Sequence, residues 1–263
     1  MNGTRVLART GDPASPGGYE VTLAADEPGV RAAQRLRHAV FTEEFGVGAV
    51  TGADGRDVDA FDAFCDHVVV HATATGELVG TYRLLPPRAA RAAGKLYADG
   101  EFDLGALAPL RDDLVEAGRA CVHRSHRNGT VMLVLWAGIL TYLTRRQLCW
   151  LCGCASIPLD DGGSRAALAW RTVRERHYAP LPHRVSPHVP WRARVGPGSP
   201  GGVPGDPGNA LPPLLRGYLH LGARVCGPPA YDAAFDAADL FVLLSLDRVH
   251  PDYLRLLRRM SQG

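Results

Sequence analysis

The alternation of apolar and polar positions predicts a helix and then a hairpin in the first third of the chain. Residues 26–46 carry apolar side chains at helical spacing, with acidic residues and Pro28 at the start and Gly46 as a stop. The next apolar runs, 67–72 and 78–85, are short and rich in β-branched residues, and a turn separates them. This pattern is typical of two antiparallel strands.

The middle of the chain predicts a strand–loop–helix–strand unit. Residues 114–122 have the pattern of a strand, 124–129 of a loop, 130–147 of a buried helix and 148–157 of a second strand. Such a βαβ crossover implies a locally parallel pair of strands with a right-handed connection. Two further elements are expected downstream, a helix at 164–178 and a final strand at 239–246.

Composition indicates one domain with a tail and an insert. A chain of 263 residues, 46% of them hydrophobic, can bury one sizeable core. Residues 1–18 are polar and rich in Gly and Pro, so we expect a disordered tail. Gly and Pro also dominate 192–210, which we expect to form a flexible insert within a single domain over 19–258.

Charge and hydropathy narrow the class of partner and the compartment. The formal net charge of +2 gives no case for nucleic acid as a partner. The longest apolar stretch, 131–143, is too short to cross a bilayer, and the first residues lack the apolar core of a secretory signal. We therefore expect a cytoplasmic protein whose cysteines stay reduced.

Three of the cysteines stand close together in an apolar run. Cys149, Cys152 and Cys154 form a C-x2-C-x-C pattern, and no second pair of Cys or His at zinc-site spacing accompanies it. Free cysteine behaves as a small buried hydrophobe. The run therefore predicts a core strand in preference to a metal site, and we expect no metal.

The loop of the βαβ unit is a candidate anion site. The N-terminus of a helix presents unpaired N–H groups that favour an anion, and glycine there lets a ligand approach the backbone. A pyrophosphate or a phosphopantetheine phosphate would suit this loop, but an ordinary solvated basic loop explains the same residues. The candidate carrier-binding residues are Arg124, Arg127, Asn128, Gly129 and Thr130.

A stretch that includes this loop resembles a known family. Residues 115–139 (VEAGRACVHRSHRNGTVMLVLWAGI) resemble the cofactor-loop region of GNAT-type acyltransferases. More narrowly, the chain resembles the L-ornithine Nα-acyltransferases, also called hemolysin-like proteins, in stretches spread over roughly residues 20–255. These stretches are 35–46, 59–70, 78–85 and 211–244. The pattern R-x2-VF, D-x-FD, G-x-YRLL and E-x2-R is also similar to acyl-homoserine-lactone synthases.

The resemblance implies a fold and an activity. The expected fold is α/β and GNAT-like, a mixed central sheet with an antiparallel N-terminal hairpin, a βαβ carrier-binding unit and helices on both faces. The expected activity transfers a (3-hydroxy)fatty acyl group from acyl carrier protein, or from acyl-CoA, to the α-amine of ornithine or a similar amino acid. The product is a lyso-ornithine lipid of bacterial lipid biosynthesis, and an amphiphilic product implies loose contact with the inner face of the membrane.

The loop also departs from the common GNAT pattern. It carries one glycine, Gly129, where that pattern has two. This fits a carrier-bound pantetheine better than free coenzyme A, and no tightly bound cofactor is expected. Two other functions stay open, an acyl-homoserine-lactone-like signal synthase and a non-catalytic member that binds acyl carrier protein or lipid.

Glu116 is the expected catalytic base. An α-amine is mostly protonated at neutral pH, so a base or a water relay must remove a proton. Glu116 is the only carboxylate of its strand, and the alternative role is a structural ion pair with Arg119. Because side chains alternate along a strand, the two share a face only if the strand bulges, and Gly118 is the expected position. Backbone N–H groups near Cys121 and Val122 would then polarise the thioester carbonyl.

An amino-acid acceptor presents a carboxylate and, in ornithine, a cationic side chain. A bidentate arginine suits the carboxylate, and an acidic side chain suits the cation. The candidates are Arg37, Arg83 and Arg119 for the first, and Asp59, Asp62, Asp66 and Asp239 for the second. Each is equally suited to a fold-stabilising pair. Phe41, Phe45 and Trp136 either line an acyl tunnel or fill the core.

Overall fold

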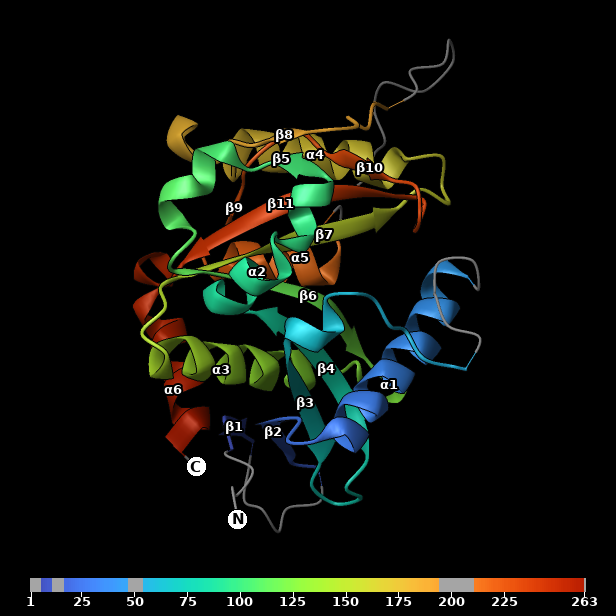
Figure 1. Cartoon of the computed structure of the whole chain (residues 1–263), viewed down its shortest axis with the longest axis vertical. Helices are drawn as coiled ribbons and strands as arrows, with labels where there is room; N and C mark the ends of the chain where they lie inside the picture. Colours follow the sequence, from blue (N-terminus) through green and yellow to red (C-terminus); the bar gives the residue numbers. More distant parts are fainter. Residues whose placement is uncertain (1–5, 11–16, 47–53, 194–210, 263) are drawn as a thin grey trace. The chain divides into compact units, whose positions relative to one another are not determined.

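A computed structural model describes residues 6–10, 17–46, 54–193 and 211–262 (Figure 1). The chain divides into two compact units. Unit 1 comprises Met1–Gly94, Val115–Cys149 and His250–Gly263, and unit 2 comprises Lys95–Leu114 and Trp150–Val249. Much of the expected tail (1–5 and 11–16) and of the expected insert (194–210) lies outside the described residues. A single domain over 19–258 stays a prediction.

Unit 1 contains an antiparallel sheet in the order β1-β2-β3-β4-β6. Its strands are β1 (Ala8–Arg9), β2 (Tyr19–Leu23), β3 (Asp66–Ala72), β4 (Leu78–Leu85) and β6 (Leu114–Val122). The strands β3 and β4 pair from Asp66↔Leu84 to His71↔Leu78. This pairing confirms the predicted hairpin. The strands form here because β-branched and apolar side chains cover both of their faces.

The helix α1 (Glu27–Phe45) lies against one face of this sheet. Asp26 caps it by accepting a hydrogen bond from the Gly29 N–H at 2.9 Å, and Gly46 ends it with a φ of 85°. One buried cluster contains Cys121 of β6 and three apolar residues of α1, which are Leu36, Val40 and Phe41. The helix predicted at 26–46 is therefore confirmed, with its apolar side toward the sheet.

The opposite face of the sheet carries α3 (Thr130–Arg145), which in turn packs against α6 (Pro251–Gln262). Trp136 of α3 contacts the ring of Tyr82 in β4, with ring centroids 6.3 Å apart. Thr141 of α3 donates its hydroxyl proton to Ser261 of α6 at 2.5 Å. The sheet of unit 1 is thus covered by helices on both faces.

The prediction of a disordered tail is wrong for the residues that form β1. Ala8 pairs with Val21, and Leu7 and Ala8 are buried. An added Cβ at Gly138 of α3 would lie 2.6 Å from a methyl carbon of Val21 and 3.6 Å from Leu7. Two apolar residues therefore hold this short segment against the sheet, although the surrounding composition is polar.

Unit 2 contains a second group of antiparallel strands. Its strand β11 (Ala237–Ser245) lies between β7 (Trp150–Pro158) and β10 (Ala230–Asp232), and it also pairs with β9 (Arg224–Val225). The short strands β5 (Phe102–Asp103) and β8 (Ser186–Pro187) form a separate pair. The helices of this unit are α4 (Ser164–Arg176) and α5 (Pro213–His220).

The cysteine-rich run forms the predicted strand β7, with Cys152 buried and its register to β11 unbroken. The order β6, α3, β7 of the predicted unit is also present. The helices α2 (Pro87–Ala93), α5 and α6 were not predicted. No helix among the described residues is long and apolar enough to cross a membrane.

Candidate active site

Glu116 lies in the first half of β6 and is 5% exposed. It pairs with Leu85 of β4. In the same two strands, Gly118 pairs with Arg83, and each of these lies two residues from its counterpart in the first pair. Cross-strand partners share a face of the sheet, and residues two apart in a strand share it too. Glu116 therefore lies on the same face as Arg83, which is the face covered by α1.

The strand β6 bulges one residue after the expected position. Its register to β4 passes from Arg83↔Gly118 to Thr81↔Cys121, so Arg119 and Ala120 together stand opposite one residue of β4. Arg119 takes the left-handed conformation with a φ of 53°, which residues other than Gly, Asn and Asp rarely adopt. The bulge sends Arg119 toward Asp59, whose Oδ2 accepts from its guanidinium at 3.2 Å.

A buried ion network occupies this face, with Arg37 of α1 at its centre. The Arg37 side chain is 0% exposed and donates to Asp57 Oδ2 and to Asp62 Oδ1, each at 2.7 Å. Arg83 donates to Asp59 Oδ1 at 2.6 Å and to Asp62 Oδ2 at 3.2 Å. All these charges are paired, and the structure therefore satisfies the requirement that buried ions have partners.

Three arginines and three aspartates balance the charge of this network. Burial would raise the pKa of Asp59, but hydrogen bonding and charge from Arg83, with Arg119, hold it below its usual range. Burial lowers the pKa of His67, which lies 3.5 Å from Arg37 and 3.2 Å from the Asp62 carbonyl. This shift favours the neutral form of His67. The formal charges of the network cancel among Arg37, Arg83, Arg119, Asp57, Asp59 and Asp62.

Two other acidic candidates have partners outside this network. Asp66 accepts from Tyr142 Oη at 2.6 Å and from Arg146 at 3.0 Å, so it belongs with α3 on the other face of the sheet. Asp239 lies in β11 of unit 2, where it neighbours Glu101 and Cys154. The structure therefore brings Asp59 and Asp62 to Glu116's face but not Asp66.

The aromatic candidates also separate. Phe41 and Phe45 of α1 contact each other edge to face at 6.2 Å, on the side of Glu116. Trp136 packs under Tyr82 on the opposite side. A tunnel lined by all three aromatic residues would have to pass through the sheet, so only Phe41 and Phe45 lie on the same face of the sheet as the candidate base.

Cys121 and Val122 follow the bulge and restore pairing with β4, opposite Thr81 and Gly80. The Cys121 side chain points into the apolar cluster with α1. Burial raises the pKa of its thiol above the usual range, so this thiol stays neutral and is unsuited to act as a nucleophile. Any role of these two residues in the reaction therefore rests on their backbone.

The carrier loop follows Val122 directly and is held by both β6 and α1. Arg127 donates to the Val122 carbonyl at 3.1 Å and pairs with Glu44 at 2.6 Å. Arg124, which is exposed, pairs with Glu43 at 3.4 Å. The two arginines expected to meet a phosphate therefore also anchor the loop to the end of α1.

The start of α3 offers backbone donors. Gly129 has a φ of 83°, and the Asn128 side chain accepts from the Thr130 N–H at 3.0 Å. Among the described residues, no acceptor pairs with the N–H groups of Gly129, Val131 and Met132. Unpaired donors at the positive end of a helix suit a phosphate or a pyrophosphate.

Sequence reasoning missed Asp57, which is 2% exposed and binds both Arg37 and, at 3.4 Å, Arg119. It stands in a connection without periodicity, so only its nearness to the other aspartates in the sequence was a signal. It also missed Glu43 and Glu44 as partners of the loop. Their position in the last turn of α1 carries no pattern that points to residues 124–127.

The fold and this site define a class of protein. The family model described as "Acetyltransferase (GNAT) domain" matches residues 36–137. The solved structure of BjaI, a CoA-dependent acyl-homoserine lactone synthase, is similar at a TM-score of 0.50 and 16% identity, covering 91% of this chain and 86% of that one. The structure of FeeM, an N-acyl amino acid synthase from uncultured soil microbes, has a TM-score of 0.51 at 14% identity, covering 92% and 98%. The chain is a GNAT-fold acyltransferase, and the predicted α/β fold is confirmed.

Curated relatives narrow the class further. An L-ornithine Nα-acyltransferase of Brucella abortus is 33% identical over 261 residues, which cover 90% of this chain and 88% of the relative. One of Rhodobacter capsulatus is 33% identical over 259 residues, covering 95% and 98%. The chain belongs to the L-ornithine Nα-acyltransferase family, as its sequence resemblance predicted.

Proposed function

We propose that this protein forms an amide between a fatty acyl group and the α-amine of ornithine. The observation that carries the proposal is the position of Glu116, buried in β6 three residues before the bulge and on the face of the arginine–aspartate network. The family and its curated relatives support the choice of ornithine as acceptor. The donor is an acyl thioester.

Glu116 acts as the general base in this proposal. Glu116, directly or through water, removes a proton from the α-ammonium group, and the freed electron pair attacks the thioester carbonyl. The tetrahedral intermediate then collapses, the carbon–sulfur bond breaks, and the thiolate leaves and takes up a proton. Backbone N–H groups near Cys121 and Val122, the residues that follow the bulge, stabilise the developing oxyanion in this proposal.

The network beside Glu116 binds the acceptor. Arg119 and Asp59 have the largest exposed fractions of its charged side chains, 15% and 22%. Arg119 is therefore best placed for the α-carboxylate and Asp59 for the side-chain ammonium group. The more deeply buried Arg37 and Arg83 hold the aspartates in position, and Phe41 contacts the acyl chain.

The carrier loop binds the phosphate of the donor's pantetheine arm through the N–H groups at the start of α3, with Arg124, Arg127 and Asn128 around them. We propose acyl carrier protein as the donor in preference to coenzyme A, on the single glycine of the loop. Comparing the two acyl thioesters at equal concentration tests this choice, and a higher kcat/KM with the coenzyme would reverse it.

A peripheral membrane contact forms part of the same proposal. The helix α6 exposes Tyr253 and Leu256 beside Arg255, Arg258 and Arg259. Apolar side chains next to arginines suit the surface of an anionic bilayer. Co-sedimentation with anionic vesicles, reduced by Leu256→Glu, would support the contact, and equal sedimentation of the two proteins would refute it.

Mass spectrometry of lipids from a bacterial host that makes no ornithine lipid tests the activity itself. The wild-type chain should give a new N-acyl-ornithine mass, Glu116→Ala should lose it, and the exposed carboxylate variant Glu175→Ala should retain it. A new mass with another amine would replace ornithine as the acceptor. No new lipid from a folded protein that still binds acyl carrier protein would favour a non-catalytic function.

A further inference from the structure

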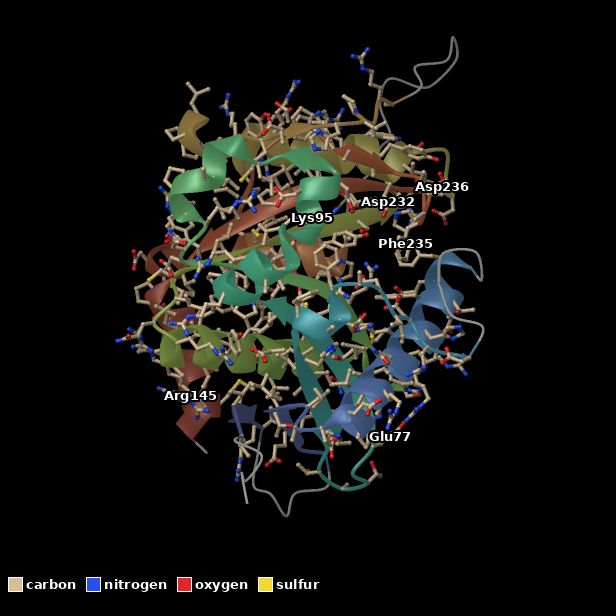
Figure 2. All side chains as sticks on the ribbon, in the orientation of Figure 1. Glu77, Lys95, Arg145, Asp232, Phe235 and Asp236 are labelled. Carbon is tan, nitrogen blue, oxygen red and sulfur yellow. The ribbon has the colours of Figure 1, made fainter. Side chains whose placement is uncertain are left out.

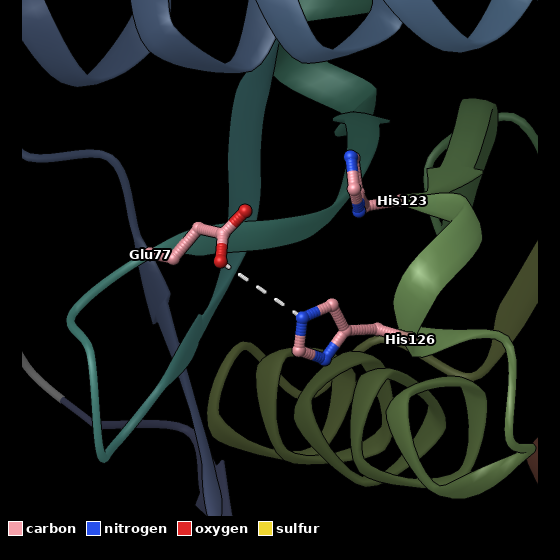
Figure 3. A group of neighbouring side chains, drawn as sticks. All are labelled: Glu77, His123 and His126. Atoms are coloured by element: carbon pink, nitrogen blue, oxygen red, sulfur yellow. Dashed lines mark ion pairs between the residues drawn. The ribbon is translucent and has the colours of Figure 1, made fainter.

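Two histidines and a glutamate gather at the side of the carrier loop. His123 directly follows β6, His126 lies in the short 3-10 turn that comes next (Arg124–His126), and Glu77 belongs to the turn between β3 and β4. Figure 2 shows Glu77 on this turn, and Figure 3 shows the three side chains directed toward one another. One ligand atom from each lies within 4.8 Å of the other two. We propose that these residues bind a divalent transition-metal cation, with Zn²⁺ as the best fit.

The ligand types carry the choice of ion. Two imidazoles and one carboxylate are a common donor set for zinc, with a fourth position left to water or to a ligand. Hard ions such as Ca²⁺ and Mg²⁺ take oxygen ligands instead. Cysteine is absent from the group, so the site differs from the thiolate site that the C-x2-C-x-C run would have suggested.

The distances suit closure around an ion. Bonds of about 2.0–2.1 Å in a tetrahedral site place ligand atoms about 3.4 Å apart. Here His126 Nε2 lies 4.0 Å from Glu77 Oε2, so these two atoms need to approach by a few tenths of an ångström. The Glu77 side chain is 51% exposed on its turn, and a half-exposed side chain can make that movement without disturbing the core.

A second layer of contacts orients His126. Its Nδ1 lies 3.0 Å from Tyr19 Oη, which also accepts from the Asn128 side-chain amide at 3.4 Å. With the proton on Nδ1 donated to Tyr19, the lone pair of Nε2 faces Glu77. Metal-binding histidines are generally held in this way, through the nitrogen that does not bind the metal.

His123 contributes an independent observation. Its Nδ1 is buried and has no hydrogen-bond partner among the described residues. A buried polar atom without a partner costs free energy, and a metal bond would remove that cost. The bound cation would tie the β3–β4 turn to the loop that precedes α3. This inference does not depend on the proposed acyl transfer.

Titration of the full, untagged chain with Co²⁺ followed by Zn²⁺ tests the site. The visible absorption spectrum of bound Co²⁺ depends on its ligands. A thiolate ligand adds a charge-transfer band that histidine and carboxylate ligands do not give. We expect one Co²⁺ per chain without that band, and displacement by Zn²⁺. His123→Ala and Glu77→Gln should each weaken binding on the order of 100-fold, and Tyr19→Phe about 10-fold.

His220→Ala serves as the matched control, because His220 is exposed at the end of α5 in unit 2, and it should bind Co²⁺ as the wild type does. Glu77→Gln alters only an exposed turn, so it keeps the test valid if His123→Ala fails to fold. Absence of binding, a thiolate band, or equal affinity in Glu77→Gln and wild type would each overturn the proposal.

Discussion

Arg37 Nε donates to Asp57 Oδ2 at 2.7 Å, and the two side chains are 0% and 3% exposed. A second nitrogen of the same guanidinium donates to the Asp57 carbonyl at 2.5 Å and to Asp62. This arginine therefore joins α1 to the connection between α1 and β3, which has no regular structure around Asp57. Arg37 therefore contributes the most deeply buried of the ion pairs that hold that connection.

Arg37→Met should lower the free energy of unfolding by about 3–5 kcal/mol, because it removes the shortest ion pair of each of two buried aspartates, Asp57 and Asp62. Urea denaturation followed by circular dichroism measures the change. Arg35→Met, on the exposed side of the same helix, should change stability by no more than about 0.5 kcal/mol. Equal stability of the two variants would show that the network is not needed for folding.

The bulge at Arg119 can be tested by a pair of substitutions that differ only in backbone freedom. Arg119→Gly and Arg119→Val both remove the guanidinium, but glycine adopts a φ of 53° freely and valine does not. The valine variant should be less stable than the glycine variant by about 1–3 kcal/mol. If the two unfold together, the left-handed conformation at this position is not maintained in solution.

Arg127 anchors the carrier loop to the end of β6 and to α1. Under the proposed function, Arg127→Ala should raise the KM for the acyl thioester about tenfold and leave kcat nearly unchanged. The loss of one charge-assisted contact, about 1.5 kcal/mol, accounts for this factor. Steady-state kinetics with Arg174→Ala of α4 as the control measures it. A fall in kcat alone would instead place Arg127 in the chemical step.

Glu101 in unit 2 predicts a pH dependence of stability. Burial, with the charge of neighbouring Asp239, raises its pKa to about 9. Between the ordinary carboxyl range and about pH 9, the folded chain keeps a proton on Glu101 that the unfolded chain releases. The free energy of unfolding therefore falls as pH rises, by at most about 1.4 kcal/mol per pH unit from this group. Glu101→Gln should flatten the decrease between pH 5 and about pH 9 in thermal melts. An unchanged slope would refute the raised pKa.

The sequence predicted the elements of the fold well where hydrophobic periodicity is strong. The helix at α1, the β3–β4 hairpin and the order of β6, α3 and β7 all follow from local patterns of apolar residues. Several short or amphipathic elements were not predicted. The strand β1 needed only Leu7 and Ala8 to be buried, and α6 follows the segment expected to be the last strand.

The candidate site was harder to predict, because its members meet only through tertiary structure. The conflict between Glu116 and Arg119 did indicate a bulge, since strand geometry alone could not place them together. Nothing local indicated that Asp57 would be enclosed, or that Glu77 would approach two histidines nearly fifty residues later in the chain. Contacts over such separations have no periodic signal along the chain.

The close approach at Gly138 also governs the N-terminus of α3. A side chain there would collide with Val21, so helix and sheet meet with almost no space between their backbones. Thr130 begins the helix about 12 Å away along its axis, at 1.5 Å per residue, and a helix of that length hardly bends. The position of the first N–H groups of α3 relative to the sheet is therefore fixed by the packing of Gly138 against Val21 in the apolar core. Under the proposed function, exchanges among residues 124–128 would change the preference for one acyl thioester over another without moving those N–H groups.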